Sequence, residues 1–334
     1  MRRPSVDTVN WGVLGVARIA TIAVIPALRG ARNARLVAIA SRTLSRAQEA
    51  AQRLGVPRAY GSYEALLADR EVHAIYIPLP NTLHREWTLR CAEAGKHVLC
   101  EKPLAVSAAD CEAMVDGCQR RGVTLMEAFM YRFHPRTQRV LEIAASGALG
   151  DLRLVRASFT FQVQTPRGNI RFDPGLGGGA LFDVGCYAVN ICRAVLGAPT
   201  DAVAFGALGP SGIDEVTGGV LRFHDRRLAV IDCGLTLPRR QEYEIVGTEG
   251  ILRVSAPDAF LPGVAETECV LERGREREVT RFPGVDQYQR MVEHFGDVLS
   301  GATLALSPQD AVGNIRVLSA LHASLRSGRR EPVA

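Results

Sequence analysis

Apolar and polar positions alternate in blocks along the first third of the chain. Short runs that are apolar almost throughout are typical of strands covered on both faces. Such runs predict strands at Val9–Leu14, Leu36–Ala40, Ala74–Pro78, His97–Cys100 and Thr124–Glu127. Longer segments with helical spacing predict helices at Ile19–Leu28, Ser45–Leu54, Leu83–Ala94 and Ala108–Arg121. This alternation indicates parallel βαβ units in a doubly wound α/β sheet.

The pattern changes near residue 125. Helices are predicted at Pro135–Ser146, Gly179–Leu196, Asp286–Ser300 and Pro308–Ser327. Strands are predicted at Leu152–Val163, Asp201–Leu208, Glu215–His224, Arg227–Leu235, Tyr243–Gly247 and Gly250–Ser255. Strands that follow one another favour a large, open, mixed or antiparallel sheet with helices on one face, an α+β layer. We therefore predict two domains, 1–125 and 126–334.

Composition is that of an ordinary globular protein. Of the 334 residues, 47% are hydrophobic and 22% are charged, which argues against disorder, collagen and coiled coil. No continuous apolar run approaches the ~18 residues of a membrane span, and no apolar segment of a signal peptide follows Arg2 and Arg3. The net charge of +5 is spread along the chain, so we expect no nucleic-acid partner.

The eight cysteines are dispersed, and none has the spacing of a disulfide framework or a zinc site. We expect reduced thiols in a cytoplasmic protein. His, Cys and Asp nowhere cluster with ligand spacing, so no metal is predicted.

A glycine turn follows the first strand. The segment matches G-x-G-x-x-G/A, with alanine at the middle glycine. Small residues there let the backbone approach a pyrophosphate at a helix N-terminus. The residues expected to hold a dinucleotide are Gly15, Val16, Ala17, Arg18 and Ile19. The alternative is an ordinary tight turn between strand and helix.

The end of the second strand distinguishes between the two nicotinamide dinucleotides. NAD sites place Asp or Glu there for the ribose hydroxyls, whereas this chain has Ser41, Arg42 and Arg46 and no acid between them. Arginine binds phosphate through charge-assisted bonds. We predict NADP(H), against the alternative that both arginines are surface charges at a helix start.

Two further strand ends carry unusual residues. Pro78, Asn81 and His84 surround the turn after one strand, and Glu101-Lys102-Pro103 ends the next. Parallel sheets bind ligands at these ends. Pro103 disfavours helical dihedrals at Lys102 and permits a cis bond, which would direct the lysine into the crevice. Otherwise Lys102 is a solvated charge.

Glu101-Lys102-Pro103 after such a nucleotide turn resembles the Gfo/Idh/MocA oxidoreductases. The segments 169–190, with its Gly177-Gly178-Gly179 run, and 126–135 are similar to the branch of glucose–fructose oxidoreductases, D-xylose 1-dehydrogenases and dimeric dihydrodiol dehydrogenases. The resemblance implies a Rossmann domain and a substrate-binding domain whose sheet forms a homodimer or homotetramer. It also implies that Asn81, His84, Glu101 and Glu127 lie at the cofactor.

The resemblance further implies catalytic roles for Lys102 and Tyr187, with Asp183 close by. A free tyrosine has a pKa of about 10, and a nearby ammonium group would lower that pKa towards neutral. The phenol could then take the proton of a substrate hydroxyl. Without the resemblance, Tyr187 reads as a core aromatic residue with Asp183 as its helix cap. Residues that could grip substrate hydroxyls or a phosphate are Tyr131, Arg132, His134, Arg171, Asp183 and Tyr187, each of which could instead be structural.

These observations predict an NADP(H)-dependent oxidoreductase that acts on an aldose or a cyclic polyol. One alternative is a sugar-nucleotide 3-ketoreductase, which would need a basic groove beside Arg171 for a diphosphate. A third possibility is an NADP(H)-binding sensor without turnover. An enzyme that recycles a tightly held cofactor between two sugars, as the glucose–fructose oxidoreductases do, is also compatible with the sequence.

Overall fold

The protein is described by a computed structural model that covers residues 8–255 and 258–333. The N-terminal segment from which the absence of a signal peptide was predicted lies largely outside the described residues. The chain folds into two compact units. The first contains the chain up to Ala105, Ala109–Met130 and Asp286–Ala311; the second contains Val106–Ala108, Tyr131–Val285 and the chain from Val312 onward.

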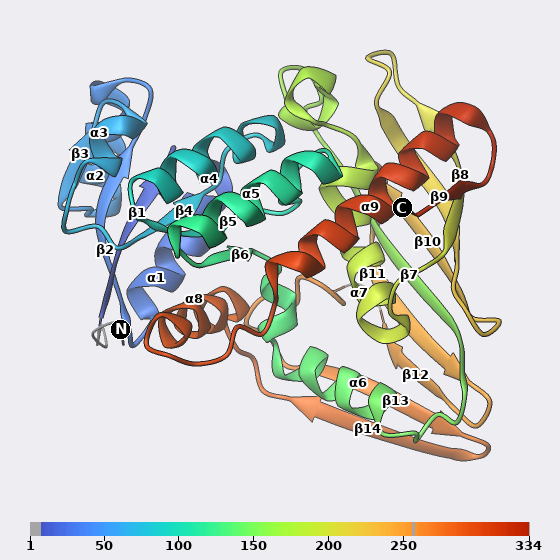
Figure 1. Ribbon diagram of the computed structural model, residues 1–334. Coiled ribbons are helices and arrows are strands. Elements are labelled where there is room, and N and C mark those ends of the chain that lie inside the picture. The colour runs from blue at the N-terminus through green and yellow to red at the C-terminus, as the bar shows by residue number, and fades with distance from the viewer. Residues whose placement is uncertain (1–7, 256–257, 334) are drawn as a thin grey trace. The chain divides into compact units, whose positions relative to one another are not determined.

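The first unit is built on a six-stranded sheet in the order β3-β2-β1-β4-β5-β6, in which every pair is parallel (Figure 1). The strands are β1 (Val9–Leu14), β2 (Ala34–Ala40), β3 (Arg58–Tyr60), β4 (Ala74–Ile77), β5 (His97–Cys100) and β6 (Leu125–Glu127). This order confirms the doubly wound sheet. It reverses between β1 and β4, which is the switch point at which such sheets bind ligands.

Helices of this unit connect the parallel strands. They are η1 (Ala20–Val24), α1 (Ile25–Gly30), α2 (Leu44–Leu54), α3 (Tyr63–Leu67), η2 (Asn81–Leu83), α4 (His84–Glu93) and α5 (Ala108–Arg121). The sequence analysis missed β3 and α3, which have only three and five residues. Elements this short show too little periodicity to be recognised.

A late segment returns to the first unit. Helix α8 (Gln287–Leu299) packs its Phe295 ring 5.2 Å from the ring of Trp11 in β1. The Asn33 side chain donates to the carbonyl of Glu293 at 2.8 Å. The predicted division had placed everything after residue 125 in the second domain. The contacts of α8 correct that boundary for residues 286–311.

The second unit is built on a nine-stranded sheet in the order β14-β13-β12-β11-β7-β10-β9-β8-β15. Its strands are β7 (Leu152–Gln162), β8 (Asp201–Leu208), β9 (Asp214–Arg222), β10 (Leu228–Gly234), β11 (Thr236–Gly247), β12 (Ile251–Val254), β13 (Thr267–Arg273), β14 (Glu276–Phe282) and β15 (Glu331–Pro332). Strands β7 and β10 are parallel and the other pairs are antiparallel, as predicted for a mixed sheet. The hairpin β13–β14 was missed because its alternating charges resemble a solvated turn.

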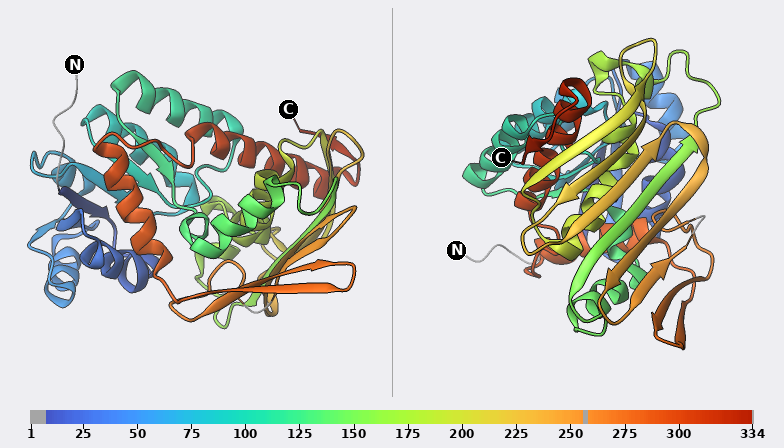
Figure 2. Two further views of the ribbon diagram at one scale, coloured as in Figure 1. Left: turned by 90° about the horizontal axis from the view of Figure 1, so that it is seen from below. Right: turned by 90° about the vertical axis from the view of Figure 1, so that its right-hand side faces the viewer.

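Helices cover one face of this sheet. They are η3 (Met130–Phe133), α6 (Pro135–Ala145), η4 (Ile170–Phe172), η5 (Pro174–Leu176), η6 (Leu181–Gly185), α7 (Cys186–Leu196) and α9 (Pro308–Ser327). The right-hand view of Figure 2 looks onto the opposite face, where no helix of the described residues lies over the strands. This confirms the predicted open sheet with helices on one face.

The helical segment 174–196 is long and apolar enough to cross a membrane, although no continuous apolar run predicted this. Within its most apolar window, 78% is buried inside the protein, as in the core helix of a globular domain. All eight cysteines are free and buried. The thiols are therefore structural side chains in the part of the chain described.

Candidate active site

The turn after β1 has the geometry of a dinucleotide site. Gly15 adopts a φ of +102°, which side chains rarely allow, and its N–H donates to the Ala40 carbonyl at 2.9 Å. A Cβ at Gly15 would lie 3.2 Å from Leu79 and 3.5 Å from the Tyr63 hydroxyl oxygen. Helical structure begins at Arg18, so backbone N–H groups follow the turn directly. Arg18 is exposed, and Val16, Ala17 and Ile19 are half-buried.

Three polar side chains gather beyond β2. Arg42 and Arg46 are exposed, while Ser41 is buried with its N–H donating to the Tyr60 carbonyl at 3.0 Å. Burial raises the pKa of Tyr63, and the positive charges of Arg42 and Arg46 oppose that rise, which places its phenol close to both guanidinium groups. Tyr63 escaped the sequence analysis because it belongs to the unpredicted helix α3.

His84 holds the turn after β4 to the strand end beside it. The imidazole is fully buried, with Nδ1 3.0 Å from the Pro103 carbonyl oxygen and Nε2 2.9 Å from that of Leu79. Both ring nitrogens therefore face backbone. The imidazole thus ties the turn after β4 to the backbone at Pro103, and its place at the cofactor stays a prediction. Pro78 is buried and Asn81 is half-buried, and their contact with cofactor stays a prediction.

A hydrogen bond between a phenol and a carboxylate lies at the end of β5. The Lys102–Pro103 bond is cis. Glu101 accepts a hydrogen bond from the Tyr76 hydroxyl at 2.6 Å. Burial raises the pKa of Tyr288 in α8, and the nearby carboxylates of Glu101 and Asp286 raise it further. Tyr288 was missed because α8 was assigned to the other domain.

Glu127, at the end of β6, is another carboxylate that accepts a hydrogen bond. Its side chain is buried, and Oε1 accepts the N–H of Leu104 at 2.7 Å. The carboxylate thus anchors the backbone just after Pro103. Its place at the cofactor stays a prediction.

In the second unit, Arg171 and Asp183 form an ion pair. Arg171 Nε donates to Asp183 Oδ2 at 2.5 Å, and the guanidinium carbon lies 5.6 Å from the centre of the Phe161 ring. Side-chain exposure is 38% for Arg171 and 17% for Asp183, so both remain within reach of a bound molecule. The structure brings together two predicted substrate residues that are twelve positions apart.

Tyr187 lies in an aromatic cluster at the start of α7. Its ring centre is 5.2 Å from that of Phe159, 5.5 Å from that of Phe260 and 5.8 Å from that of Tyr131. The residue is 3% exposed. Such packing holds the ring in one orientation, which suits a catalytic phenol and a core aromatic residue equally.

Three further candidates have partners inside the unit. Tyr131 is fully buried and donates to Asn190 Oδ1 at 2.6 Å; Arg132 donates to the same oxygen at 3.1 Å. His134 is fully buried, and its Nδ1 accepts the N–H of Arg136 at the start of α6. Tyr131 and His134 therefore make contacts that support the fold, and the proposed contacts of Tyr131, Arg132 and His134 with substrate stay predictions.

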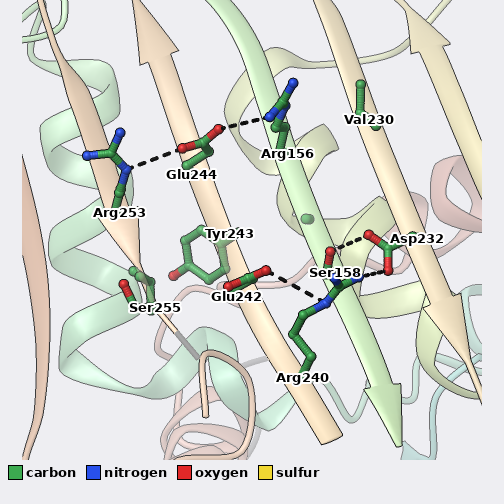
Figure 3. A pocket seen from close by; sticks show the side chains of 12 residues that line it. Arg156, Ser158, Val230, Asp232, Arg240, Glu242, Tyr243, Glu244, Arg253 and Ser255 are labelled. Atoms are coloured by element: carbon green, nitrogen blue, oxygen red, sulfur yellow. Dashed lines mark hydrogen bonds and ion pairs between the residues drawn. The ribbon is translucent and has the colours of Figure 1, made fainter. Parts of the chain in front are cut away.

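The second unit has cavities whose lining can be compared with the predicted site residues. A cavity of about 560 Å³ between residues 166–176 and 210–215 is lined by chain neighbours of Arg171 but not by Arg171, and its charged lining residues are Arg167, Asp173 and Glu215. Another of about 430 Å³ on the sheet contains none of the predicted site residues (Figure 3). Among the described residues, no group of three or more His, Cys, Asp or Glu side chains could hold a metal ion.

Comparison with known families matches both units. The model of the oxidoreductase family with an NAD-binding Rossmann fold, GFO_IDH_MocA, matches residues 9–129. The model of the GFO/IDH/MocA C-terminal domain matches residues 137–253.

Individual relatives cover most of the chain. The chain is 41% identical to the NADP(+) D-xylose 1-dehydrogenase 2 of Haloferax volcanii, over 87% of this chain and 90% of the relative. It is 35% identical to the trans-1,2-dihydrobenzene-1,2-diol dehydrogenase of Xenopus tropicalis, over 73% and 72% of the two chains. A solved structure of a 3-ketoreductase from Actinomadura kijaniata, with NADP and TDP-benzene, superposes with a TM-score of 0.88 at 31% identity, covering 95% of this chain and 98% of that one.

Proposed function

The chain belongs to the GFO/IDH/MocA family of NAD(P)-binding oxidoreductases, and we propose that it is an NADP(H)-dependent enzyme acting on sugars. In this proposal it transfers a hydride between nicotinamide and a C–OH or C=O group of an aldose or cyclic polyol. The first unit binds the cofactor and the second binds the substrate.

The side chains that follow β2 are the main support for NADP(H) as the cofactor. Ser41, Arg42 and Arg46 offer a hydroxyl and two guanidinium groups, and Tyr63 adds a phenol whose pKa the charges of both arginines lower. No acid stands between residues 41 and 46 to bind the ribose hydroxyls of NAD. These donors fit a 2′-phosphate, and the tight turn at Gly15 fits the pyrophosphate. The NADP(+) in the name of the Haloferax relative supports the same choice.

In the proposed chemistry, side chains transfer the proton and the cofactor transfers the hydride. The nicotinamide, when bound, accepts or supplies the hydride. Tyr187 takes the proton of the substrate hydroxyl during oxidation and returns it during reduction. Lys102 hydrogen-bonds the substrate oxygen and favours the ionised phenol by its positive charge.

Arg171 and Asp183 are proposed to hydrogen-bond the hydroxyl groups of the substrate. Asp183 can accept hydrogen bonds from hydroxyls, and Arg171 keeps donors beyond the Nε that holds Asp183. Because the pair fixes both side chains, a sugar would meet a preformed set of donors and acceptors.

A sugar-nucleotide ketoreductase is the second candidate, supported by the Actinomadura structure with TDP-benzene. That reading requires a basic groove beside Arg171. The cavity of residues 166–176 and 210–215 is lined by Arg167, Asp173 and Glu215 but not by Arg171, so it supplies no such groove. We rank the sugar first because the chain is 41% identical to the D-xylose 1-dehydrogenase and 31% identical to the ketoreductase.

The open sheet supports the further proposal of a homodimer or homotetramer. Val230 and Phe205, which is 70% exposed, belong to the uncovered face. Beside them Glu244 pairs with Arg156 and Arg253 in a row of alternating charges (Figure 3). Exposed apolar area next to such charges suits association with a second copy. The eight buried free thiols suit the proposed cytoplasmic location.

A substrate screen tests the proposed function. Aldoses, 1,5-anhydro sugars, keto sugars and cyclic diols are offered with NADP⁺, NADPH, NAD⁺ and NADH, and the nicotinamide absorbance is followed. We expect turnover of an aldose or polyol with a preference for NADP⁺ of at least about tenfold in kcat/KM. A preference below about twofold would overturn the cofactor assignment. Absence of turnover with every compound would favour a binding protein instead.

A further inference from the structure

The helix that carries Asp183 and Tyr187 begins without a cap of its own. Its first turn, η6, starts at Leu181, and Ala180 before it makes no capping bond through its side chain. The first N–H groups of a helix have no partner within the helix. Ser, Thr, Asp or Asn usually accepts from them, but residues 177–180 are three glycines and an alanine.

Asp214 supplies the missing acceptor from a strand. It begins β9, is 3% exposed, and its Oδ2 accepts the N–H of Leu181 at 2.8 Å. The same oxygen accepts the hydroxyl of Thr217 at 2.9 Å. The backbone of Ala180 also hydrogen-bonds this carboxylate.

The carboxylate explains why glycine stands before the helix. A Cβ on Gly179, whose φ is +115°, would lie 2.2 Å from Asp214 Oδ1. The N–H of Gly179 donates to the carbonyl of Arg171 at 2.9 Å. Gly179 thus lets Asp214 reach the helix while tying the helix start to the loop that carries Arg171.

We propose that Asp214 is a positioning residue for the substrate site of the second unit, a role that rests on the proposed function. It fixes the start of the helix and, through that start, the place of Asp183 opposite Arg171. Displacements of about 1 Å at a reacting centre can cost about a hundredfold in rate. Asp214 acts through the helix and is assigned no contact with substrate.

The charge of Asp214 contributes to the strength of this cap. Burial raises the pKa of Asp214 to about 6, although hydrogen bonds from Leu181, Thr217 and Ala180 oppose the rise. At pH 8 the carboxylate is therefore ionised despite its burial. Charge-assisted bonds from N–H groups are shorter and stronger than neutral ones, which gives the helix start a more closely defined position.

Replacement by the isosteric amide tests the proposal. In Asp214→Asn we expect kcat/KM for the sugar to fall at least about tenfold, with the Kd of NADPH unchanged. Backbone amide hydrogen exchange at residues 180–185 should become faster, since the cap on that turn is weakened. If this variant does not fold, Thr217→Val removes one donor to the carboxylate and should give smaller changes in the same direction.

Asp201→Asn is the matched control. Asp201 is another buried carboxylate of the same sheet, in β8, and its partners are Thr200 and Arg222. Its replacement should lower stability while leaving kcat/KM for the sugar within about twofold.

The two readouts separate the possible outcomes. Unchanged exchange at residues 180–185 in Asp214→Asn would overturn the proposal. Faster exchange with unchanged kcat/KM would also overturn it, because Asp214 would then be a structural cap only. If the unaltered protein turns over no sugar, the proposed function fails by itself, and the exchange measurement still decides whether Asp214 holds the helix start.

Discussion

In the first unit, candidate cofactor residues follow the ends of parallel strands, whereas in the second unit the two ion-paired candidates for substrate binding lie on a loop and a helix. Gly15, Ser41 and Glu101 each come directly after a strand of the first sheet. Arg171 and Asp183 are joined by an ion pair, and Asp214 holds the start of the helix from another strand.

This difference separates two ways of building a site. Parallel strands deliver their carboxyl ends to one edge of a sheet, so chain order alone brings those residues together. A loop and a helix have no such shared edge, and their side chains meet only through specific contacts. We therefore expect cofactor and substrate binding to respond to different substitutions.

Tyr187→Phe should have the largest effect, lowering turnover without changing cofactor binding. Removal of the hydroxyl takes away the proposed proton acceptor, so kcat should fall by about 10²–10⁴-fold. Binding of NADPH, measured by fluorescence titration, should be unchanged because the cofactor residues belong to the first unit.

Tyr243→Phe provides the matched control for this substitution. Tyr243 is 2% exposed and its ring centre lies 5.6 Å from that of Phe260, which also contacts Tyr187. Loss of its hydroxyl should leave kcat within about threefold. Near-normal turnover of Tyr187→Phe would reduce Tyr187 to a core aromatic residue.

The double variant Arg42→Ala/Arg46→Ala should affect only the first unit. With the guanidinium groups gone, kcat/KM for NADP⁺ should fall about 10–100-fold, and that for NAD⁺ should change little. Arg53→Ala, at the other end of α2, serves as the control. Equal losses with both cofactors would show that the arginines do not read the 2′-phosphate.

Arg171→Lys should affect only the second unit. Lysine keeps the charge but lacks the planar set of donors that holds Asp183, so KM for the sugar should rise about tenfold. The KM for NADP⁺ at saturating sugar is the internal comparison. If the sugar KM does not move, the ion pair only organises the loop.

His134→Ala should give the smallest effect, on stability alone. His134 Nδ1 caps α6 by accepting the N–H of Arg136, and loss of such a cap costs about 1 kcal/mol. For a unit of this size, Tm should fall by about 2–4 °C. A rise in sugar KM without a change in Tm would indicate instead that His134 contacts the substrate.

Much of the first unit could be predicted from local sequence, and less of the second. The turn at Gly15, the residues after β2 and the end of β5 each depend on a few consecutive residues. Tyr63, Tyr288 and Asp214 had no such signal, because their partners lie far away in the chain. The burial of His84 and His134 also had no signal, since burial cannot be read from an isolated histidine.

The sequence by itself determined the alternation of parallel strands and helices, the glycine turn and the family to which the chain belongs. Short-range backbone sterics and hydrophobic periodicity suffice for the first two, and the family follows from the resemblance of its motifs. Only the tertiary structure decided that α8 returns to the first unit, that Arg171 pairs with Asp183 and that a strand carboxylate caps the helix of Tyr187. Those outcomes depend on which distant groups can satisfy buried charges and N–H groups, and that is fixed by packing in three dimensions.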